Sequence, residues 1–276
     1  MSPILPRGRP IAIFDSGIGG LPYLSAARDL LPSESFIYIA DRLGFPYGTK
    51  PRQEVRDIVL GLVERLVGAY SPKAIVIACN TASQAALEAA RKANPGLLIV
   101  GTVPAVKPAA ESSRSGVIGI LATAGAVEDP YLDSLEARYA KGISVIREGA
   151  QELVSFVERR SALAGEAERR EAVAPYVRRL VDRGADVIVL ACTHFLHLRD
   201  DIAAEAGPSV DVVDSRTGVV RRLRQVLGER GLLNDAGRDG GGPGLFLLTG
   251  DEPFEAEYGL LAEAFGLARP RPVPLR

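Results

Sequence analysis

The chain has two cysteines, and each ends a short apolar run and opens a polar turn. The two matching segments are Ile75-Val76-Ile77-Ala78-Cys79-Asn80-Thr81 and Val187-Ile188-Val189-Leu190-Ala191-Cys192-Thr193-His194. A cysteine in a polar setting can take up a proton as its thiolate and give one back as the thiol. Two such groups acting on opposite faces of one carbon could remove one proton and return another, which would invert that stereocentre. The repeat therefore predicts two similar halves that each bring one thiol to a shared site.

Other roles for Cys79 and Cys192 remain open from these residues alone. A lone buried cysteine is most often an inert small hydrophobe, and two cysteines could also form a disulfide. A zinc site would need a familiar ligand spacing, which the two cysteines with His194 and His197 do not provide. A Cys192 nucleophile with His194 as its base would suit amide or thioester hydrolysis, but that interpretation leaves the second thiol unexplained.

Composition and charge exclude several classes of protein. The chain has 276 residues, of which 47% are hydrophobic and 24% charged, so it can bury one large core or two smaller ones. Its formal net charge is −1 and it has no basic block, which argues against nucleic-acid binding. No apolar run reaches about 18 residues and no apolar signal segment stands at the start, so we expect no membrane span. These features favour the cytoplasm, where thiols stay reduced.

Short apolar runs alternate with amphipathic segments along the chain. The runs predict strands at 11–14, 36–39, 75–78, 97–100, 116–121, 143–146, 187–191, 210–213 and 245–249. The amphipathic segments predict helices at 21–31, 51–70, 82–93, 128–139, 151–160, 166–182 (kinked or split near Pro175), 217–229 and 253–265, with one more ending at about 205. The glycine-rich residues 234–244 predict a flexible loop. This alternation predicts an α/β protein with mostly parallel sheets flanked by helices.

Polar residues gather where the predicted strands end. The first strand leads into Asp15-Ser16-Gly17-Ile18-Gly19-Gly20, which could hold a carboxylate or phosphate or could serve only as a structural turn. Its glycine spacing does not fit the dinucleotide-binding fingerprint. The second strand leads into Pro46-Tyr47-Gly48, which can offer backbone amides and an aromatic wall. Ligands of parallel sheets bind beyond the carboxyl ends of the strands, so these segments predict a single site.

Five segments in this order resemble the glutamate racemase family, within the cofactor-independent aspartate/glutamate racemase superfamily. They are Asp15-Ser16-Gly17-Ile18-Gly19-Gly20, Pro46-Tyr47-Gly48, Cys79-Asn80-Thr81-Ala82, Ala122-Thr123-Ala124-Gly125 and Cys192-Thr193-His194. Together they span most of the chain, and Thr249-Gly250-Asp251 also looks like the family's C-terminal segment. The Asp-Ser-Gly and Pro-Tyr-Gly segments favour glutamate racemase over its aspartate and hydantoin relatives.

The resemblance implies interconversion of L- and D-glutamate for peptidoglycan synthesis, with no pyridoxal phosphate, other cofactor or metal. It implies that Cys79 acts on the D-enantiomer and Cys192 on the L-enantiomer, with Asp15 and His194 assisting the thiols. The implied substrate-binding residues are Ser16, Pro46, Tyr47, Gly48, Asn80, Thr81, Thr123 and Thr193, and Glu158 is a further candidate near the site. Glutamate is the implied partner and a homodimer the implied assembly, with no nucleic acid and no membrane.

Two departures from the family pattern bear on the site. Ala126 stands where the family often has threonine, and Phe195-Leu196 stand where it often has Tyr-Pro. Neither change removes a base, but the first could alter a hydrogen bond and the second could alter the turn behind His194.

The sequence predicts two similar domains with the active site in the cleft between them. The first domain comprises residues 1–105 and is completed by 215–276, and the second comprises 106–214. Two alternatives stay open. The first is racemization of aspartate or hydantoins, which depends on whether the pocket accommodates a glutamate side-chain carboxylate. The second is a non-catalytic amino-acid sensor or protein-binding homologue, which would bind its ligand without exchanging the α-proton.

Overall fold

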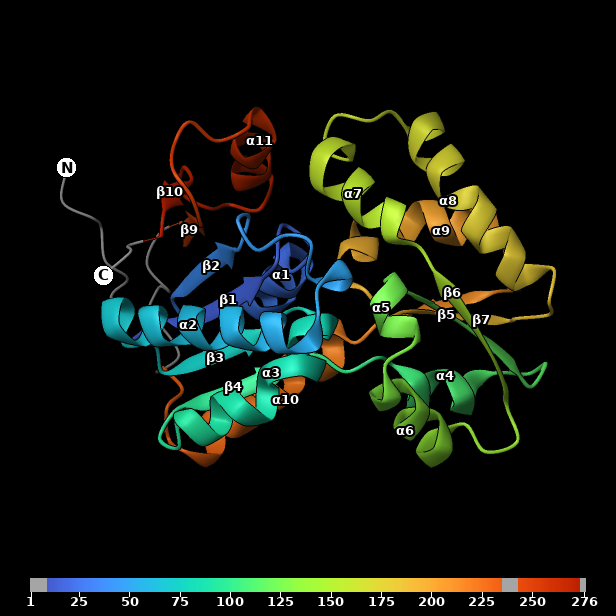
Figure 1. Cartoon of the computed structure of the whole chain (residues 1–276), viewed down its shortest axis with the longest axis horizontal. Helices are drawn as coiled ribbons and strands as arrows, with labels where there is room; N and C mark the ends of the chain where they lie inside the picture. The colour runs from blue at the N-terminus through green and yellow to red at the C-terminus, as the bar shows by residue number, and fades with distance from the viewer. Residues whose placement is uncertain (1–8, 235–242, 274–276) are drawn as a thin grey trace. The chain divides into compact units, whose positions relative to one another are not determined.

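The computed structural model describes residues 9–234 and 243–273, which divide into two compact units (Figure 1). Within the described residues, the first unit comprises 9–45, 51–102, 216–234 and 243–273. The second unit comprises 46–50 and 103–215. Each unit has its own sheet with helices packed on it.

The first unit is built on a parallel sheet of six strands in the order β10-β9-β2-β1-β3-β4. The strands are β1 Ile11–Asp15, β2 Phe36–Ala40, β3 Ala74–Ile77, β4 Leu98–Gly101, β9 Leu245–Leu248 and β10 Arg271–Pro272. The helices are α1 Leu21–Leu30, α2 Arg52–Tyr70, α3 Asn80–Ala93, α10 Arg216–Glu229 and α11 Ala256–Ala264. Helix α2 packs against α3, and α1 packs against α10 (Figure 1). The strands β1, β2 and β3 are buried along their whole length, in keeping with sequences that are apolar except for Asp15 at the end of β1 and the hydroxyl of Tyr38 in β2.

The second unit is built on a parallel sheet of four strands in the order β6-β5-β7-β8. The strands are β5 Val117–Ala122, β6 Ser144–Gly149, β7 Val187–Leu190 and β8 Asp211–Val213. The helices are α4 Val106–Ser112, α5 Ala124–Val127, α6 Pro130–Tyr139, α7 Gln151–Arg160, α8 Glu166–Val181 and α9 Arg199–Ala206, with 3-10 helices η1 Tyr47–Thr49 and η2 Thr193–Leu198. Helix α4 packs against α6, and α8 against α9.

The two sheets repeat one topology. The order β2-β1-β3-β4 in the first unit corresponds to β6-β5-β7-β8 in the second, so β3 and β7 occupy equivalent places. Cys79 follows β3 and Cys192 follows β7. The predicted α/β class is therefore confirmed, with two similar halves, parallel sheets and flanking helices.

Several elements differ from the sequence-based expectation, among them α3, α8 and α4. Helix α3 begins at Asn80 instead of residue 82, because extended Cys79 is its N-cap and accepts the N–H of Ser83 at 2.9 Å. Helix α8 continues through Pro175 as one helix, so the expected split is wrong; its buried apolar face offsets the missing backbone donor. The sequence pattern does not predict α4, because seven residues are too few to show a clear helical periodicity of apolar residues. The predicted loop at 234–244 lies largely outside the described residues.

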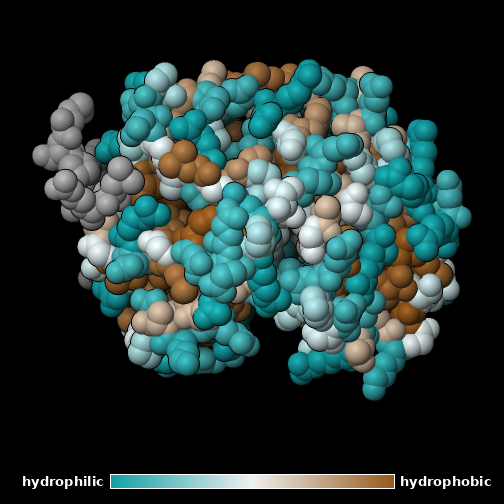
Figure 2. Space-filling model, viewed as in Figure 1, coloured by the Kyte–Doolittle hydropathy of each residue, from teal (hydrophilic) through white to brown (hydrophobic). Residues whose placement is uncertain are grey.

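Hydrophilic side chains cover most of the face of the molecule seen in Figure 2, with apolar side chains in smaller patches among them. The exposed large hydrophobic residues of the described chain are Leu43, Val103, Leu163, Leu233 and Leu260. Of the helices that the structure describes, none combines the length and the apolar character that a membrane span requires.

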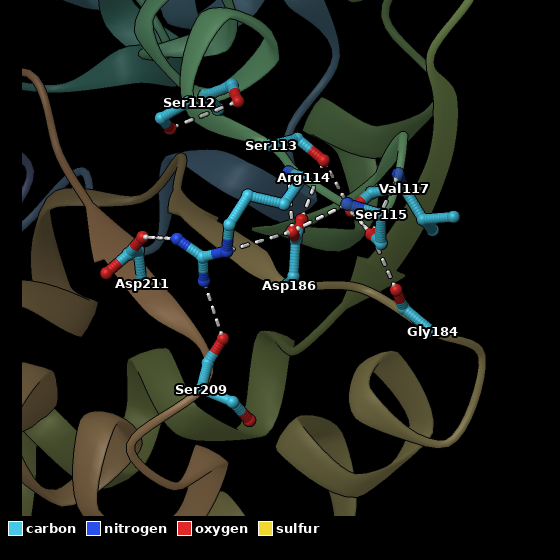
Figure 3. A network of polar contacts seen from close by, with 10 residues as sticks. Ser112, Ser113, Arg114, Ser115, Val117, Gly184, Asp186, Ser209 and Asp211 are labelled. Atoms are coloured by element: carbon cyan, nitrogen blue, oxygen red, sulfur yellow. Dashed lines mark hydrogen bonds and ion pairs between the residues drawn. The ribbon is translucent and has the colours of Figure 1, made fainter.

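Asp186 ties the start of β7 to the turn before β5 (Figure 3). Its Oδ1 accepts the hydroxyl of Ser113 at 2.6 Å, and its Oδ2 accepts the N–H groups of Arg114 and Ser115 at 2.6 and 2.8 Å. Arg114 extends the network to Asp211 through an ion pair of 3.3 Å. Burial by itself would raise the pKa of Asp186, but the hydrogen bonds outweigh it and lower the pKa from 3.8 to about 2. The network joins the amino ends of β5 and β7, whereas Cys192 follows the carboxyl end of β7.

We expect Asp186→Asn to lower the free energy of unfolding by about 1–2 kcal/mol at pH 7, after a discount for solvent screening. The folded-state pKa lies below the ordinary 3.8, so the stabilisation is present above about pH 4 and is lost as the pH falls toward 2. Denaturant unfolding of wild type and variant at pH 7 and pH 3 measures this difference. Asp200→Asn is the control, because that side chain is 97% exposed. A difference that stays constant with pH would contradict the prediction.

Candidate active site

Asp15 and Cys79 lie at neighbouring strand ends in the first unit. Strands β1 and β3 pair with Phe14 opposite Ile77, and the N–H of Ala78 donates to the Phe14 carbonyl at 2.8 Å. The carboxylate and the thiol therefore come from the same edge of the sheet. Asp15 is fully buried and Cys79 is 6% exposed. Both groups are shielded from bulk water, so their fixed neighbours control any proton transfer.

The residues that follow these two strand ends are polar and mostly buried. The N–H of Ser16 donates to Asp15 Oδ1 at 2.7 Å, which fixes the carboxylate's orientation. Asn80 is 4% exposed, and within the described part of the chain its Oδ1 has no hydrogen-bond partner. Thr81 is half-buried. Asn80 therefore presents an acceptor that a bound donor could satisfy.

The Tyr38 hydroxyl holds the glycine loop after β1. It donates to the Gly17 carbonyl at 2.7 Å and accepts the N–H of Gly20 at 3.0 Å. A Cβ on Gly20 would lie 2.9 Å from the Cβ of Ala78, so only glycine lets the loop approach the turn that carries Cys79 this closely. Tyr38 thus positions the loop that begins at Asp15.

Ser83 and Thr102 support the same turn from behind. Ser83 Oγ lies 3.1 Å from the Ile77 carbonyl and 2.9 Å from the Thr102 N–H. The sequence pattern does not single out Tyr38 or Ser83, because each lies in a stretch whose pattern indicates packing alone. A single hydroxyl inside such a stretch was the signal that could have identified them.

Thr123 and Cys192 lie at neighbouring strand ends in the second unit. Strands β5 and β7 pair with Leu121 opposite Leu190, and the N–H of Ala191 donates to the Leu121 carbonyl at 2.8 Å. Thr123 is 5% exposed and Cys192 is 6% exposed. Both cysteines of the chain are free thiols. Each unit therefore places one buried thiol at the carboxyl edge of its sheet.

The two departures from the family pattern lie in the helical turns that follow β5 and β7. Thr123 is the N-cap of α5, and its Oγ1 accepts the backbone N–H of Ala126 at 3.2 Å, a bond that alanine retains. Phe195 is fully buried and Leu196 is 6% exposed, and both continue η2 after Cys192.

His194 and Glu158 form a buried pair in the second unit. His194 Nε2 lies 3.0 Å from Glu158 Oε2, and the two side chains are 2% and 6% exposed. Glu158 comes from α7, which packs against η2. A carboxylate can only accept, so while Glu158 is ionised the imidazole carries a hydrogen on Nε2. Glu158 can therefore orient His194 and stabilise its protonated form.

The segment Pro46–Gly48 packs within the second unit, although it follows a strand of the first. A Cβ on Gly48 would lie 2.8 Å from both Thr123 Cβ and Gln151 Oε1. A Cβ on Gly125 would lie 2.7 Å from the Gly48 carbonyl oxygen. Glycine at both positions therefore lets this segment contact the loop after β5 directly.

The predicted site residues fall into two groups, one in each unit. The first unit holds Asp15, Ser16, Cys79, Asn80 and Thr81. The second unit holds Pro46, Tyr47, Gly48, Thr123, Glu158, Cys192, Thr193 and His194. Tyr47 and Thr193 are each 1% exposed, and Pro46 is half-buried. Among the residues that the structure describes, no cluster of three or more His, Cys, Asp or Glu side chains could hold a metal ion.

Sequence comparison places the chain among racemases. The family described as Asp/Glu/Hydantoin racemase matches residues 23–223, well over half of the chain. Glutamate racemase of Sphingopyxis alaskensis is 48% identical over 218 residues, which cover 78% of this chain and 80% of that protein. Glutamate racemase of Roseiflexus sp. is 40% identical over 227 residues, which cover 82% of each.

Solved structures agree with the sequence comparison. Escherichia coli glutamate racemase, crystallised with L-glutamate and an activator, has a TM-score of 0.83 and 28% identity, covering 96% of this chain and 98% of that one. Glutamate racemase of Thermus thermophilus has a TM-score of 0.73 and 32% identity, covering 97% of both chains. The chain therefore belongs to the Asp/Glu/hydantoin racemase family and is an amino-acid racemase of the glutamate racemase type.

Proposed function

We propose that the chain interconverts L- and D-glutamate by proton transfer between the α-carbon and two thiols. Cys79 acts on the D-enantiomer and Cys192 on the L-enantiomer. The main support is that the equivalent strands β3 and β7 each lead into a buried free cysteine. Each thiol also has an assisting group near it in its own unit, Asp15 at the neighbouring strand end for Cys79 and His194 two residues along for Cys192.

The proposed step balances with these groups alone. One thiolate takes the α-proton, so the C–H bond breaks, an S–H bond forms and the electron pair stays on the α-carbon. The other thiol gives its proton to the opposite face of that carbon and becomes a thiolate. The α-proton is weakly acidic, so hydrogen-bond donors to the α-carboxylate must stabilise the charge that develops. Hydroxyls and backbone N–H groups provide such donors without burying a fixed positive charge.

The remaining site residues bind the substrate in this proposal. Ser16, Thr81, Thr123 and Thr193 hold the α-carboxylate and the ammonium group. The unpartnered Oδ1 of Asn80 suits the ammonium, because a buried acceptor without a donor costs about 1–3 kcal/mol. The backbone of the segment Pro46–Gly48 holds the side-chain carboxylate.

The cellular role follows from the reaction. D-glutamate made in the cytoplasm supplies peptidoglycan synthesis in this proposal.

The proposed enzyme is a homodimer that needs neither pyridoxal phosphate nor metal. Light scattering coupled to gel filtration tests the dimer, and a monomeric mass at working concentration would refute it.

Incubation with D- or L-glutamate in D2O tests the reaction, with EDTA present and no added pyridoxal phosphate. We expect the α-proton NMR signal to disappear while chiral chromatography shows inversion. The same assay with aspartate and with hydantoins separates a different substrate from the proposed one. Glutamate that binds without exchange or inversion would identify a non-catalytic homologue and refute the proposal.

We expect Glu158→Gln to lower kcat roughly 10- to 100-fold in both directions. Glutamine can still hydrogen-bond to His194, but it lacks the negative charge that stabilises the imidazolium. Steady-state rates from each enantiomer measure the effect. Glu152→Gln is the matched control, because Glu152 is an exposed residue of α7 that accepts from the Tyr176 hydroxyl at 2.9 Å. Wild-type kcat in a folded Glu158→Gln protein would show that the charge is not needed.

A further inference from the structure

Two side chains close to the proposed site, one buried and one half-buried, carry buried polar atoms with no hydrogen-bond partner among the described residues. They are Asn80, through Oδ1, and Gln151, through both Oε1 and Nε2. The other buried atoms of this kind are Glu34 Oε2, which is ion-paired with Lys73, and Arg65 Nε. An unpaired buried polar group destabilises the folded state, so its presence requires an explanation such as a bound ligand. The proposed function already explains the unpaired atom of Asn80, which would bind the substrate's ammonium group. It does not explain the unpaired atoms of Gln151.

Gln151 lies at the edge of the sheet where the second unit's site residues gather. It opens α7 after β6, and the N–H of the preceding Ala150 donates to the Ala122 carbonyl of β5 at 2.9 Å. This places Gln151 level with Thr123, which follows Ala122. Gln151 Oε1 lies 2.8 Å from the position that a Cβ on Gly48 would occupy. The carboxamide therefore lies against the segment that holds the substrate's side chain in the proposed function.

On the basis of that proposed function, we propose that Gln151 Nε2 binds the side-chain carboxylate of glutamate and helps set the length of the amino acid that the site accepts. A carboxamide N–H suits a carboxylate oxygen and adds no charge that would compete with the thiols. The side chain of aspartate is one methylene shorter, so its carboxylate does not reach the same donor.

The contact has a distinct kinetic consequence. The side-chain carboxylate keeps its charge and place while the α-carbon inverts, so Gln151 binds the substrate and the transition state equally well. The loss of such a contact raises KM and leaves kcat unchanged.

Gln151→Met tests the proposal, since methionine keeps the length of the side chain and removes both polar atoms. We expect KM for L- and D-glutamate to rise about 10-fold, while kcat stays within about twofold of wild type. We expect the preference for glutamate over aspartate in kcat/KM to fall. The Tm is expected not to fall, because the apolar side chain leaves no unpaired polar atom in the interior. Gln53→Met is the matched control, as Gln53 is exposed and its Nε2 donates to Asp57 at 2.8 Å.

Gln151→Glu provides a second test that retains a polar side chain of the same size. It sets a negative charge against the substrate carboxylate, so KM rises further than in the methionine variant. Unchanged KM in either folded variant would overturn the proposal, and a lower Tm with unchanged KM would assign the carboxamide to an enclosed water instead. A fall in kcat at constant KM would also overturn it. Wild-type protein inactive on glutamate would refute the proposed function itself, an outcome visible before any variant is compared.

Discussion

We expect Cys79→Ser and Cys192→Ser each to lower the rate of racemization roughly 1000-fold, because an alcohol ionises far less readily than a thiol and is a poor base at neutral pH. The two enantiomers have equal free energies, so kcat/KM must fall by the same factor from L- and from D-glutamate. This equality is an internal control. A measured fall in kcat/KM from only one of the two enantiomers would indicate a fault in the assay.

The same two variants separate proton exchange from inversion. Cys79→Ser keeps Cys192, so in D2O we expect slow exchange of the α-proton of L-glutamate with retention of configuration. Cys192→Ser keeps Cys79, and we expect the same of D-glutamate. Proton NMR measures the exchange, chiral chromatography measures the configuration, and the double variant is the control for background. Exchange of both enantiomers by one single variant at equal rates, each faster than its residual racemization, would point to a single base and contradict the two-thiol mechanism.

We expect Asp15→Asn to lower kcat by about 100-fold or more, since Asp15 is the fully buried carboxylate at the strand end beside Cys79. The amide oxygen of asparagine can still accept the N–H of Ser16, so the loop keeps its conformation while the group loses its charge. The change slows the step at Cys79 most, so the primary isotope effect with α-deuterated D-glutamate increases more than that with the L-enantiomer. Asp29→Asn, an exposed residue of α1, is the control. Near-wild-type kcat in a folded Asp15→Asn protein would remove Asp15 from the mechanism.

The sequence by itself determined the class of fold and the places of the two thiols. Parallel strands covered on both faces must be apolar throughout, so polar residues can enter only where a strand ends. The segments ending in Cys79 and Cys192 follow that rule, which is why their repetition predicted two similar halves. The equivalent positions of β3 and β7 confirm this repetition. The same local logic identified Asp15, which ends β1, whereas Thr123, which directly follows β5, was named through the family resemblance.

Tertiary structure alone decided which distant groups lie against the turns and segments of the proposed site. Glu158 meets His194 across 36 residues of sequence, and the Tyr38 hydroxyl reaches into the loop after β1 from a neighbouring strand. The segment Pro46–Gly48 follows β2 yet packs against Thr123 in the second unit, and Gln151 lies against it with its polar atoms unpaired. Local periodicity records which face of an element is buried, but it carries no information about which distant element covers that face. Such partners are fixed only when the helices and strands pack together.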